Sequence, residues 1–219
     1  MNLYKGYVPY ITDTETTGMN PEKNEIIEYS SCRLRIESPK NIIKEQKTWY
    51  IKPLNVQNIE KEALAINGHK LEDLLHQTEV GKNTYRPLEE VVPEIESWMN
   101  EDDVSVVDRL LVGQNIESFD MPFIEKAWEK VQSKQTLPFD FERNRCALDT
   151  LHIVKFIDLC SGKRRKYMNL SSLVKDFHVK KTKAHRAEGD VQMTTDLLIK
   201  IFEAGFDVFG GKFVDCYGE

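Results

Sequence analysis

Two acidic side chains lie one residue apart in the segment 11–18, which reads I-T-D-T-E-T-T-G. In an extended strand, residues i and i+2 face the same side of the sheet, about 6–7 Å apart along the chain. Asp13 and Glu15 therefore point the same way, and two like charges raise each other's pKa unless a cation lies between them. This arrangement favours a divalent-metal site. A polar strand end that runs into a turn at Gly18 is the alternative for the pair taken alone.

Two further aspartates each begin the apolar face of a predicted helix. Asp120 precedes an apolar stripe formed by Phe123, Ile124, Ala127 and Val131. Asp190 begins a face shared with Thr194, Leu197 and Ile201. A carboxylate on a buried face requires a cation, a metal ion or several hydrogen bonds. Helix capping explains either aspartate alone, but together with Asp13 and Glu15 they indicate one acidic site.

A histidine precedes the second of these aspartates by five residues. On an ideal helix His185 and Asp190 would be about 140° apart and would not share a face. If His185 lies on the loop that leads into the helix, both side chains can converge on one site. Histidine is the side chain that most readily accepts a proton near neutral pH.

Composition is that of an ordinary globular domain. The chain has 219 residues, of which 40% are hydrophobic and 30% charged, enough for one domain with a substantial core. We expect a single domain over 1–219 that is cytoplasmic and does not contact a membrane, since the sequence contains no membrane-spanning or signal-peptide pattern. The four cysteines, which are Cys32, Cys146, Cys160 and Cys216, form no C-x-x-C pair and are expected to be reduced.

Positive charge is concentrated near the third acidic position. Residues 161–190 carry a net charge of +6, whereas the whole chain carries −6. The basic residues of this stretch are Lys163, Arg164, Arg165, Lys166, Lys175, Lys180, Lys181, Lys183 and Arg186. Such a stretch in an acidic protein is either a phosphate-facing surface or a solvated loop.

Residue patterns predict strands first and then alternating strands and helices. Strands are predicted at 10–15, 25–36, 46–51, 109–114 and 145–148. Helices are predicted at 59–67, 70–77, 87–100, 119–132, 150–160, 169–177 and 188–204. Short links favour an antiparallel meander of the first three strands, and the order as a whole favours an α/β domain with a mixed sheet flanked by helices. Asp149 is expected to cap the helix that follows it.

Three segments together resemble a known family. Residues 13–18 (D-T-E-T-T-G), 112–120 (V-G-Q-N-I-E-S-F-D) and 185–190 (H-R-A-E-G-D) resemble the three motifs of the DEDDh 3′→5′ exonucleases. These DnaQ-like enzymes include the proofreading subunits of bacterial replicases. The resemblance covers about residues 7–205 and leaves 206–219 as a short extension. It implies an RNase H-like, five-stranded mixed sheet in which the fourth and fifth strands are parallel.

The resemblance also implies a division of roles among the five motif residues. Asp13 would bridge two Mg²⁺ or Mn²⁺ ions, Glu15 and Asp190 would complete the shell of one ion, and Asp120 would hold the other. His185 would deprotonate the attacking water. Oxygen ligands without cysteine suit these metals, and two ions about 3.5–4 Å apart can activate water and stabilise the leaving oxygen. Asp149 is expected to be structural.

Substrate contacts follow from the same resemblance. Residues 63–69 (A-L-A-I-N-G-H) resemble the segment that holds the terminal nucleotide, although Ile66 would serve equally well as a core residue. The expected substrate-binding residues are Thr16, Gly18, Ile66, Asn67, His69, Asn115, Phe119, Lys163, Arg164, Arg165 and Lys183. The basic members would follow the backbone of the entering strand.

These features predict a metal-dependent 3′→5′ exonuclease. It would release nucleoside 5′-monophosphates from single-stranded or frayed 3′ ends, with DNA favoured. The alternatives are a proofreading subunit that docks on a DNA polymerase or another replication or repair partner, an RNA-trimming exoribonuclease, and an inactive nucleic-acid-binding relative. RNA stays an alternative because no reader of the 2′-hydroxyl is identified. The oligomeric state stays open.

Overall fold

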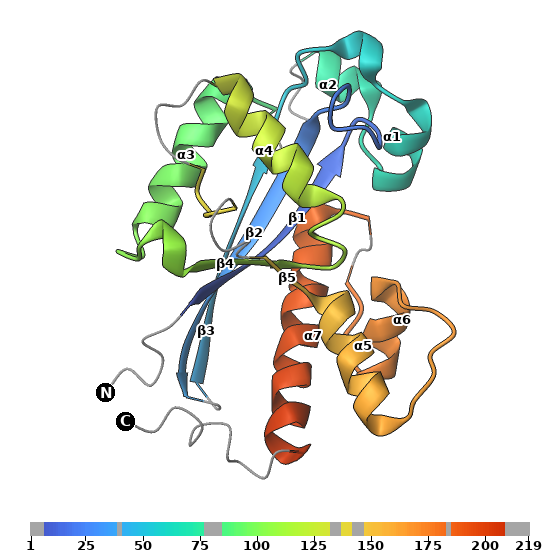
Figure 1. The fold of residues 1–219 in the computed structure, drawn as a ribbon. Coiled ribbons are helices and arrows are strands. Elements are labelled where there is room, and N and C mark those ends of the chain that lie inside the picture. The colour runs from blue at the N-terminus through green and yellow to red at the C-terminus, as the bar shows by residue number, and fades with distance from the viewer. Residues whose placement is uncertain are drawn as a thin grey trace.

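A mixed five-stranded sheet forms the centre of the computed structural model, which describes residues 7–38, 41–76, 85–131, 137–141, 147–182 and 185–208 (Figure 1). The strand order is β3-β2-β1-β4-β5. β1 (Val8–Thr16), β2 (Ile26–Ser38) and β3 (Asn41–Tyr50) are antiparallel. β4 (Arg109–Gly113) is parallel to β1, and β5 (Ala147–Asp149) is parallel to β4. The predicted RNase H-like fold is confirmed.

Helices cover both faces of this sheet (Figure 1). α3 (Leu88–Asn100) and α4 (Asp120–Val131) pack on one face, and α7 (Ala187–Val208) packs on the other. α5 (Thr150–Ser161) and α6 (Leu170–Asp176) pack against α7. The short helices α1 (Lys61–Asn67) and α2 (Leu71–His76) lie near the end of β1. Among the described residues, no helix combines the length and apolarity needed to cross a membrane.

Alternation along β1 decides which side chains reach which layer. Tyr10 packs in the large cluster formed with α3 and α4, and the next residue, Ile11, packs with Val191 and Leu198 of α7. Because side chains alternate along a strand, Asp13 and Glu15 share the face of Ile11. β1 therefore directs both acids toward α7.

Two strands, β1 and β3, begin earlier than predicted. β3 begins at Asn41 and not at residue 46, because residues 41–45 also pair with β2. The outermost pair joins Asn41 to Ser38. β1 begins at Val8, two residues before the predicted start at residue 10, and so includes Pro9. Pro9 lies opposite Leu110 of β4, whereas the antiparallel pairing with β2 begins only at Tyr10. The proline therefore does not interrupt the antiparallel ladder.

The ends of the chain are described only in part. α7 continues to Val208, beyond the predicted end of the last helix, and residues 209–219 lie outside the described residues. Residues 145–146 of the predicted fifth strand also lie outside them. A single domain over 1–219 stays a prediction.

Candidate active site

Three carboxylates meet where β1 ends and α7 begins. Asp13 and Glu15 lie beyond Ile11, the last β1 residue that pairs with β4. Asp190 lies in the first turn of α7. One carboxylate oxygen from each of the three acids can be chosen so that all lie within 4.8 Å of one another. A cation placed among these oxygens would contact ligands from two separate elements.

Burial and mutual repulsion raise the pKa of each acid. Burial, followed by the charges of Asp120 and Glu15, raises the pKa of Asp13 well above its ordinary value. Burial and neighbouring carboxylates raise the pKa of Glu15 to about 8. Burial likewise raises the pKa of Asp190 to about 6, although the backbone N–H of His185 opposes that shift. The site therefore favours protons or metal ions over free carboxylates.

Asp120 is not one of these three clustered acids, and it approaches β1 from the opposite face of the sheet. It is the first residue of α4 and only 2% exposed. Its Oδ1 accepts hydrogen bonds from both the backbone N–H and the hydroxyl of Thr14, each at 2.8 Å. Burial raises the pKa of Asp120 to about 7, against the effect of these bonds. The predicted fourth acid is thus fixed to the strand residue between Asp13 and Glu15.

The approach to α7 explains the geometry of His185. His185 is exposed and has a φ of 61°, a left-handed conformation that is uncommon for residues other than glycine. Its backbone N–H donates to Oδ2 of Asp190 at 3.2 Å. His185 thus lies on the loop, as the sequence predicted, and the loop is tied directly to an acid of the site.

The other oxygen of Asp190 fits a metal ligand. Asp190 Oδ1 is buried and has no hydrogen-bond partner among the described residues. Buried polar atoms are nearly always paired, so this oxygen calls for a cation or water. The donor set contains carboxylate oxygens and no thiolate, which suits Mg²⁺ or Mn²⁺. The residues present therefore fit the metal that the motifs imply.

Glu28 is a site residue that the sequence analysis missed. It lies on β2 directly opposite Glu15, and it is fully buried. Its carboxylate pairs with Nε of Arg186 at 3.0 Å and accepts from the backbone N–H of Glu188 at 3.3 Å. It thereby binds both the motif around His185 and the first turn of α7. The available signal was an acid directly after two isoleucines at the start of a predicted strand.

Glu28 also explains the position of His69. Nε2 of His69 lies 2.9 Å from Oε2 of Glu28, and Nδ1 contacts the hydroxyl of Tyr85. The His69 side chain has no exposed surface. Its expected contact with substrate has no support in this position, because both ring nitrogens already have buried partners.

The neighbouring substrate candidates are divided between internal and exposed positions. Asn67 is buried, and its side chain donates to the carbonyl of Thr16 and accepts from the N–H of His69. The Thr16 hydroxyl donates to the carbonyl of Gly18 at 2.6 Å. Ile66, by contrast, is 64% exposed, so the alternative that it is a core residue was wrong. Asn67 and Thr16 hold α1 against the end of β1.

Gly18 is required by close packing. A Cβ at this position would lie 2.4 Å from the side chain of Asn24. Asn24 in turn donates to the carbonyl of Asn58 at 2.7 Å. A larger residue at 18 would displace the Asn24 side chain that makes this hydrogen bond.

The loop before α4 presents the other predicted contacts. Asn115 is exposed with a φ of 62°, and its N–H donates to Asp149 at 3.0 Å. Asp149 also accepts from the N–H of Leu151, which confirms that it caps α5 and is structural. Phe119 is half-buried, and its ring packs 5.2 Å from that of Phe123 between centroids. Asn115 and Phe119 therefore lie on the short loop that delivers Asp120.

The basic candidates also differ in exposure. Lys163 and Arg164 are exposed. The Arg165 side chain is only 6% exposed and forms ion pairs with Asp158 and Asp176. Arg165 thus stabilises its own loop, and the expected contact with substrate has no support in this position. Lys183 lies outside the described residues.

The raised pKa values predict how the stability of the metal-free protein depends on pH. In the unfolded chain these acids titrate near pH 4, whereas in the folded chain Asp190, Asp120 and Glu15 have pKa values of about 6, 7 and 8. Their contribution to stability is therefore fully present below about pH 4 and is lost as the pH rises through about 6–8.

Thermal unfolding with and without Mg²⁺ checks this prediction. The melting temperature of the EDTA-treated protein should fall between about pH 5 and pH 8, since the unfolded chain releases protons that the folded site retains. Saturating Mg²⁺ should remove most of that fall, because the cation takes the place of the protons. The same decline in both conditions would mean that the acids do not form a metal site.

Comparisons with known proteins agree with this geometry. The sequence profile of the exonuclease family RNase_T matches residues 10–198. Ribonuclease T of Vibrio parahaemolyticus is 27% identical over 138 residues, which is 62% of this chain and 61% of the relative. Ribonuclease T of Actinobacillus pleuropneumoniae is 24% identical over 135 residues, 61% of this chain and 59% of the relative. The chain thus spans about three-fifths of the length of these curated relatives.

Solved structures share the fold at lower identity. E. coli exonuclease I in complex with a dT13 oligonucleotide aligns with a TM-score of 0.68 and 18% identity, over 94% of this chain and 44% of the other. Exonuclease I of Methylocaldum szegediense aligns with a TM-score of 0.72 and 18% identity, over 94% of this chain and 43% of the other. The profile match covers well over half of the sequence and includes all five motif residues, so the chain belongs to the RNase_T family of DEDDh exonucleases.

Proposed function

We propose that this protein is a metal-dependent 3′→5′ exonuclease that releases nucleoside 5′-monophosphates from single-stranded or frayed ends. One observation carries the proposal. Asp13, Glu15 and Asp190 bring carboxylate oxygens within 4.8 Å of one another, and a buried oxygen of Asp190 has no partner among the described residues. Such acids would repel a phosphodiester, so the site needs cations before it can bind substrate.

The acids divide into two ligand groups in this proposal. Asp13, Glu15 and Asp190 would hold one Mg²⁺ or Mn²⁺ ion, and Asp13 together with Asp120 would hold a second. Two ions bound in this way would polarise the scissile phosphate and neutralise the leaving 3′-oxygen. The hydrogen bonds from Thr14 to Asp120 support the division, because they tie the fourth acid to the strand that carries Asp13.

His185 is proposed as the general base. Its exposed side chain stands at the entrance to α7, and its N–H is hydrogen bonded to Asp190. The ring would accept the proton of the attacking water at a free nitrogen and release it to solvent. The Glu28–Arg186 ion pair would hold the neighbouring backbone in place during this step.

The comparisons support two substrate classes. The structural neighbours include an exonuclease bound to a single-stranded DNA oligonucleotide, whereas the sequence relatives are named ribonuclease T. We favour single-stranded DNA and keep an RNA-trimming activity as the second candidate. Docking on a polymerase or another replication partner stays a prediction from family resemblance.

Initial rates on matched substrates test this choice. The protein should be incubated with Mg²⁺ and single-stranded DNA, duplex DNA or RNA of the same sequence, each labelled at the 5′ end. We expect the highest rate on single-stranded DNA and a lower rate on blunt duplex DNA. A higher rate on RNA would reverse the order of the two candidates.

A further inference from the structure

The loop 162–168 between α5 and α6, here called the basic loop, is held by a buried arginine at its centre. Nε of Arg165 donates to both carboxylate oxygens of Asp158, at 3.0 and 2.9 Å. Arg165 also pairs with Asp176, and its guanidinium lies 4.9 Å from the ring centroid of Phe177. These contacts attach the loop to α5, to α6 and to the residue that follows α6.

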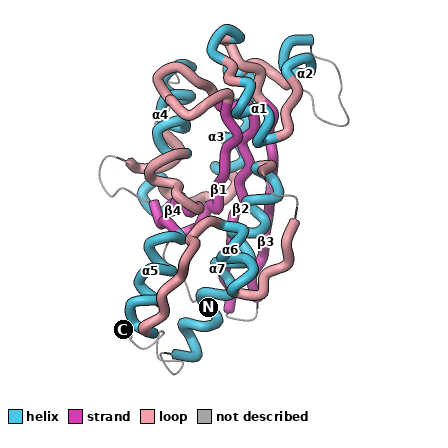
Figure 2. The backbone as a smooth tube through the Cα atoms, turned by 90° about the vertical axis from the view of Figure 1, so that its right-hand side faces the viewer, coloured by secondary structure: helices cyan, strands magenta, loops and turns pink. Residues whose placement is uncertain are grey.

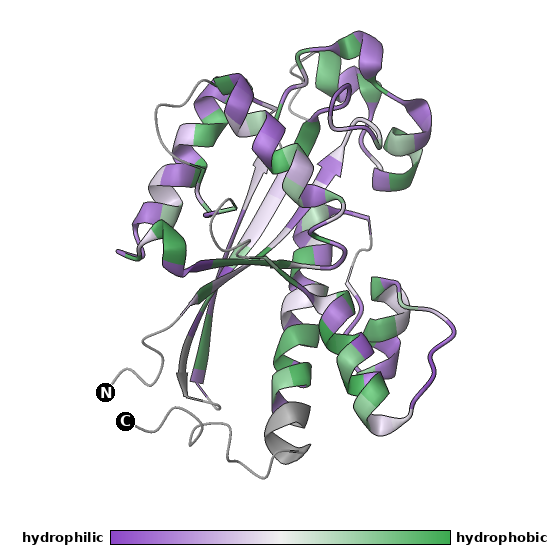
Figure 3. Ribbon diagram, viewed as in Figure 1, coloured by the Kyte–Doolittle hydropathy of each residue, from purple (hydrophilic) through white to green (hydrophobic). Residues whose placement is uncertain are grey.

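The residues on either side of Arg165 are left exposed. Lys163, Arg164, Lys166 and Tyr167 are all exposed, and the Tyr167 side chain is 57% accessible. Nζ of Lys166 lies 5.1 Å from the centroid of the Tyr167 ring. Figure 3 shows the hydrophilic character of this stretch, at the outer right of the molecule. An exposed aromatic ring with a lysine against it, in a loop that exposes two further cations, has no role in the core.

A direct hydrogen bond connects the end of the basic loop to the segment between β4 and α4. Nε2 of Gln114 donates to the carbonyl of Met168 at 2.9 Å. Gln114 follows β4 immediately and begins the segment that delivers Asp120, and its Oε1 accepts from the Thr150 hydroxyl. The residue after Tyr167 is therefore fastened to the loop before α4.

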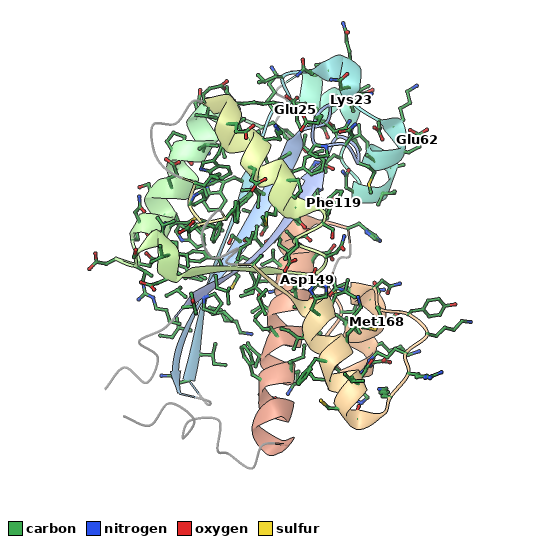
Figure 4. All side chains as sticks on the ribbon, in the orientation of Figure 1. Lys23, Glu25, Glu62, Phe119, Asp149 and Met168 are labelled. Carbon is green, nitrogen blue, oxygen red and sulfur yellow. The ribbon has the colours of Figure 1, made fainter. Side chains whose placement is uncertain are left out.

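The basic loop runs between α5 and α6 and ends near the start of α4. Figure 2 shows the basic loop rising between α5 and α6 toward the middle of the molecule. In Figure 4, Phe119, Asp149 and Met168 descend along the right-hand side of the molecule, from the start of α4 to the end of the basic loop. The basic loop therefore ends beside the segment that carries Phe119 and Asp120.

We propose that the basic loop is a second binding subsite for single-stranded polynucleotide, on the 5′ side of the terminal nucleotides. A base would stack on Tyr167, and phosphates would contact Lys163, Arg164 and Lys166. This inference rests on the proposed nuclease function. Charge favours this occupant, because residues 161–190 carry +6 in a chain of net charge −6. Stacking combined with cations is how proteins hold single strands without reading sequence.

Steady-state kinetics on thymidine oligonucleotides of two lengths test the subsite. A trinucleotide would occupy only the acidic site, whereas a dodecanucleotide would also reach the basic loop. Tyr167→Ala should raise the KM for the dodecanucleotide by about fivefold or more, since stacking is worth that much per base. The KM for the trinucleotide should not change. Tyr167→Phe, which keeps the ring, should behave like the wild type.

The chain offers a matched control in Tyr7, which is also exposed, at 55%, and immediately precedes β1. Tyr7→Ala should leave both KM values unchanged. Replacing Lys163, Arg164 and Lys166 with glutamine should flatten the salt dependence of the dodecanucleotide KM. Melting temperatures of all variants should match the wild type, because the altered side chains are exposed.

Three other outcomes would overturn the proposed subsite, and one of them would overturn the proposed nuclease function as well. If the wild-type protein hydrolyses both lengths and Tyr167→Ala leaves their KM ratio unchanged, the subsite is wrong and the nuclease function stands. That result would favour a protein partner, and not a polynucleotide, as the ligand of the exposed Tyr167 ring. If both KM values rise equally, Tyr167 acts on the acidic site and not on the distant part of the strand. If the wild type hydrolyses neither, the proposed function fails and the subsite with it.

Discussion

Replacement of Asp13 with asparagine is expected to abolish Mg²⁺-dependent hydrolysis and to stabilise the metal-free protein. Burial and neighbouring acids raise the pKa of Asp13 well above its ordinary value, so its charge is unfavourable without a cation. Asparagine keeps the shape and removes that charge. Activity should fall at least about a thousandfold, since charge stabilisation by metal ions is worth several kcal/mol.

Two measurements on this variant separate catalysis from folding. Thermal unfolding in EDTA should show a higher melting temperature than the wild type, by about 2–4 °C for each kcal/mol gained. Added Mg²⁺ should stabilise the variant much less than the wild type. Asp196→Asn is a suitable control, because Asp196 lies on α7 with a side chain that is 38% exposed and has Lys44 as its partner. Hydrolysis that persists in Asp13→Asn would contradict the assigned metal site.

His185→Asn should lower the turnover number by about 10²–10⁴-fold, the usual contribution of a general base. Asparagine tolerates the left-handed conformation, so the φ of 61° and the N–H bond to Asp190 should both persist. Mg²⁺ affinity, measured by calorimetry, should therefore stay close to that of the wild type. The variant removes the proton acceptor without releasing the loop.

His178 provides the matched control for this substitution. It is also exposed and left-handed, with a φ of 55°, and it lies after α6, away from the three-carboxylate cluster. His178→Asn should retain full turnover. A large loss of Mg²⁺ affinity in His185→Asn would instead identify His185 as a metal ligand.

Local periodicity was sufficient to find the acids of the site. The two-residue period of a strand places Asp13 and Glu15 on one face, and they do lie together beside α7. Helical periodicity places Asp120 at the head of an apolar face, where it is 2% exposed. In each case the signal lies within one element, so no knowledge of tertiary packing was needed.

Contacts between elements could not be predicted in this way. Glu28 lies opposite Glu15 only because β1 pairs with β2 in this register, and the register cannot be read from either strand alone. His69 appeared free in the sequence because its partners, Glu28 and Tyr85, are distant along the chain. Arg165 lies in a run of basic residues, but its side chain is buried because it forms ion pairs with Asp158 and Asp176. A run of basic residues in the sequence therefore does not show which of its side chains are exposed, because packing between elements decides that.

In the proposed mechanism, metal held by Asp13, Glu15 and Asp190 drives hydrolysis from the 3′ end. The most direct measurement follows single-stranded DNA labelled at its 5′ end, in Mg²⁺ and in EDTA, with wild-type protein and Asp13→Asn. We expect a ladder that shortens from the 3′ end, with nucleoside 5′-monophosphates as products, only for the wild type in Mg²⁺. Cleavage that resists EDTA, or fragments that arise by internal cuts or from the 5′ end, would rule out this mechanism.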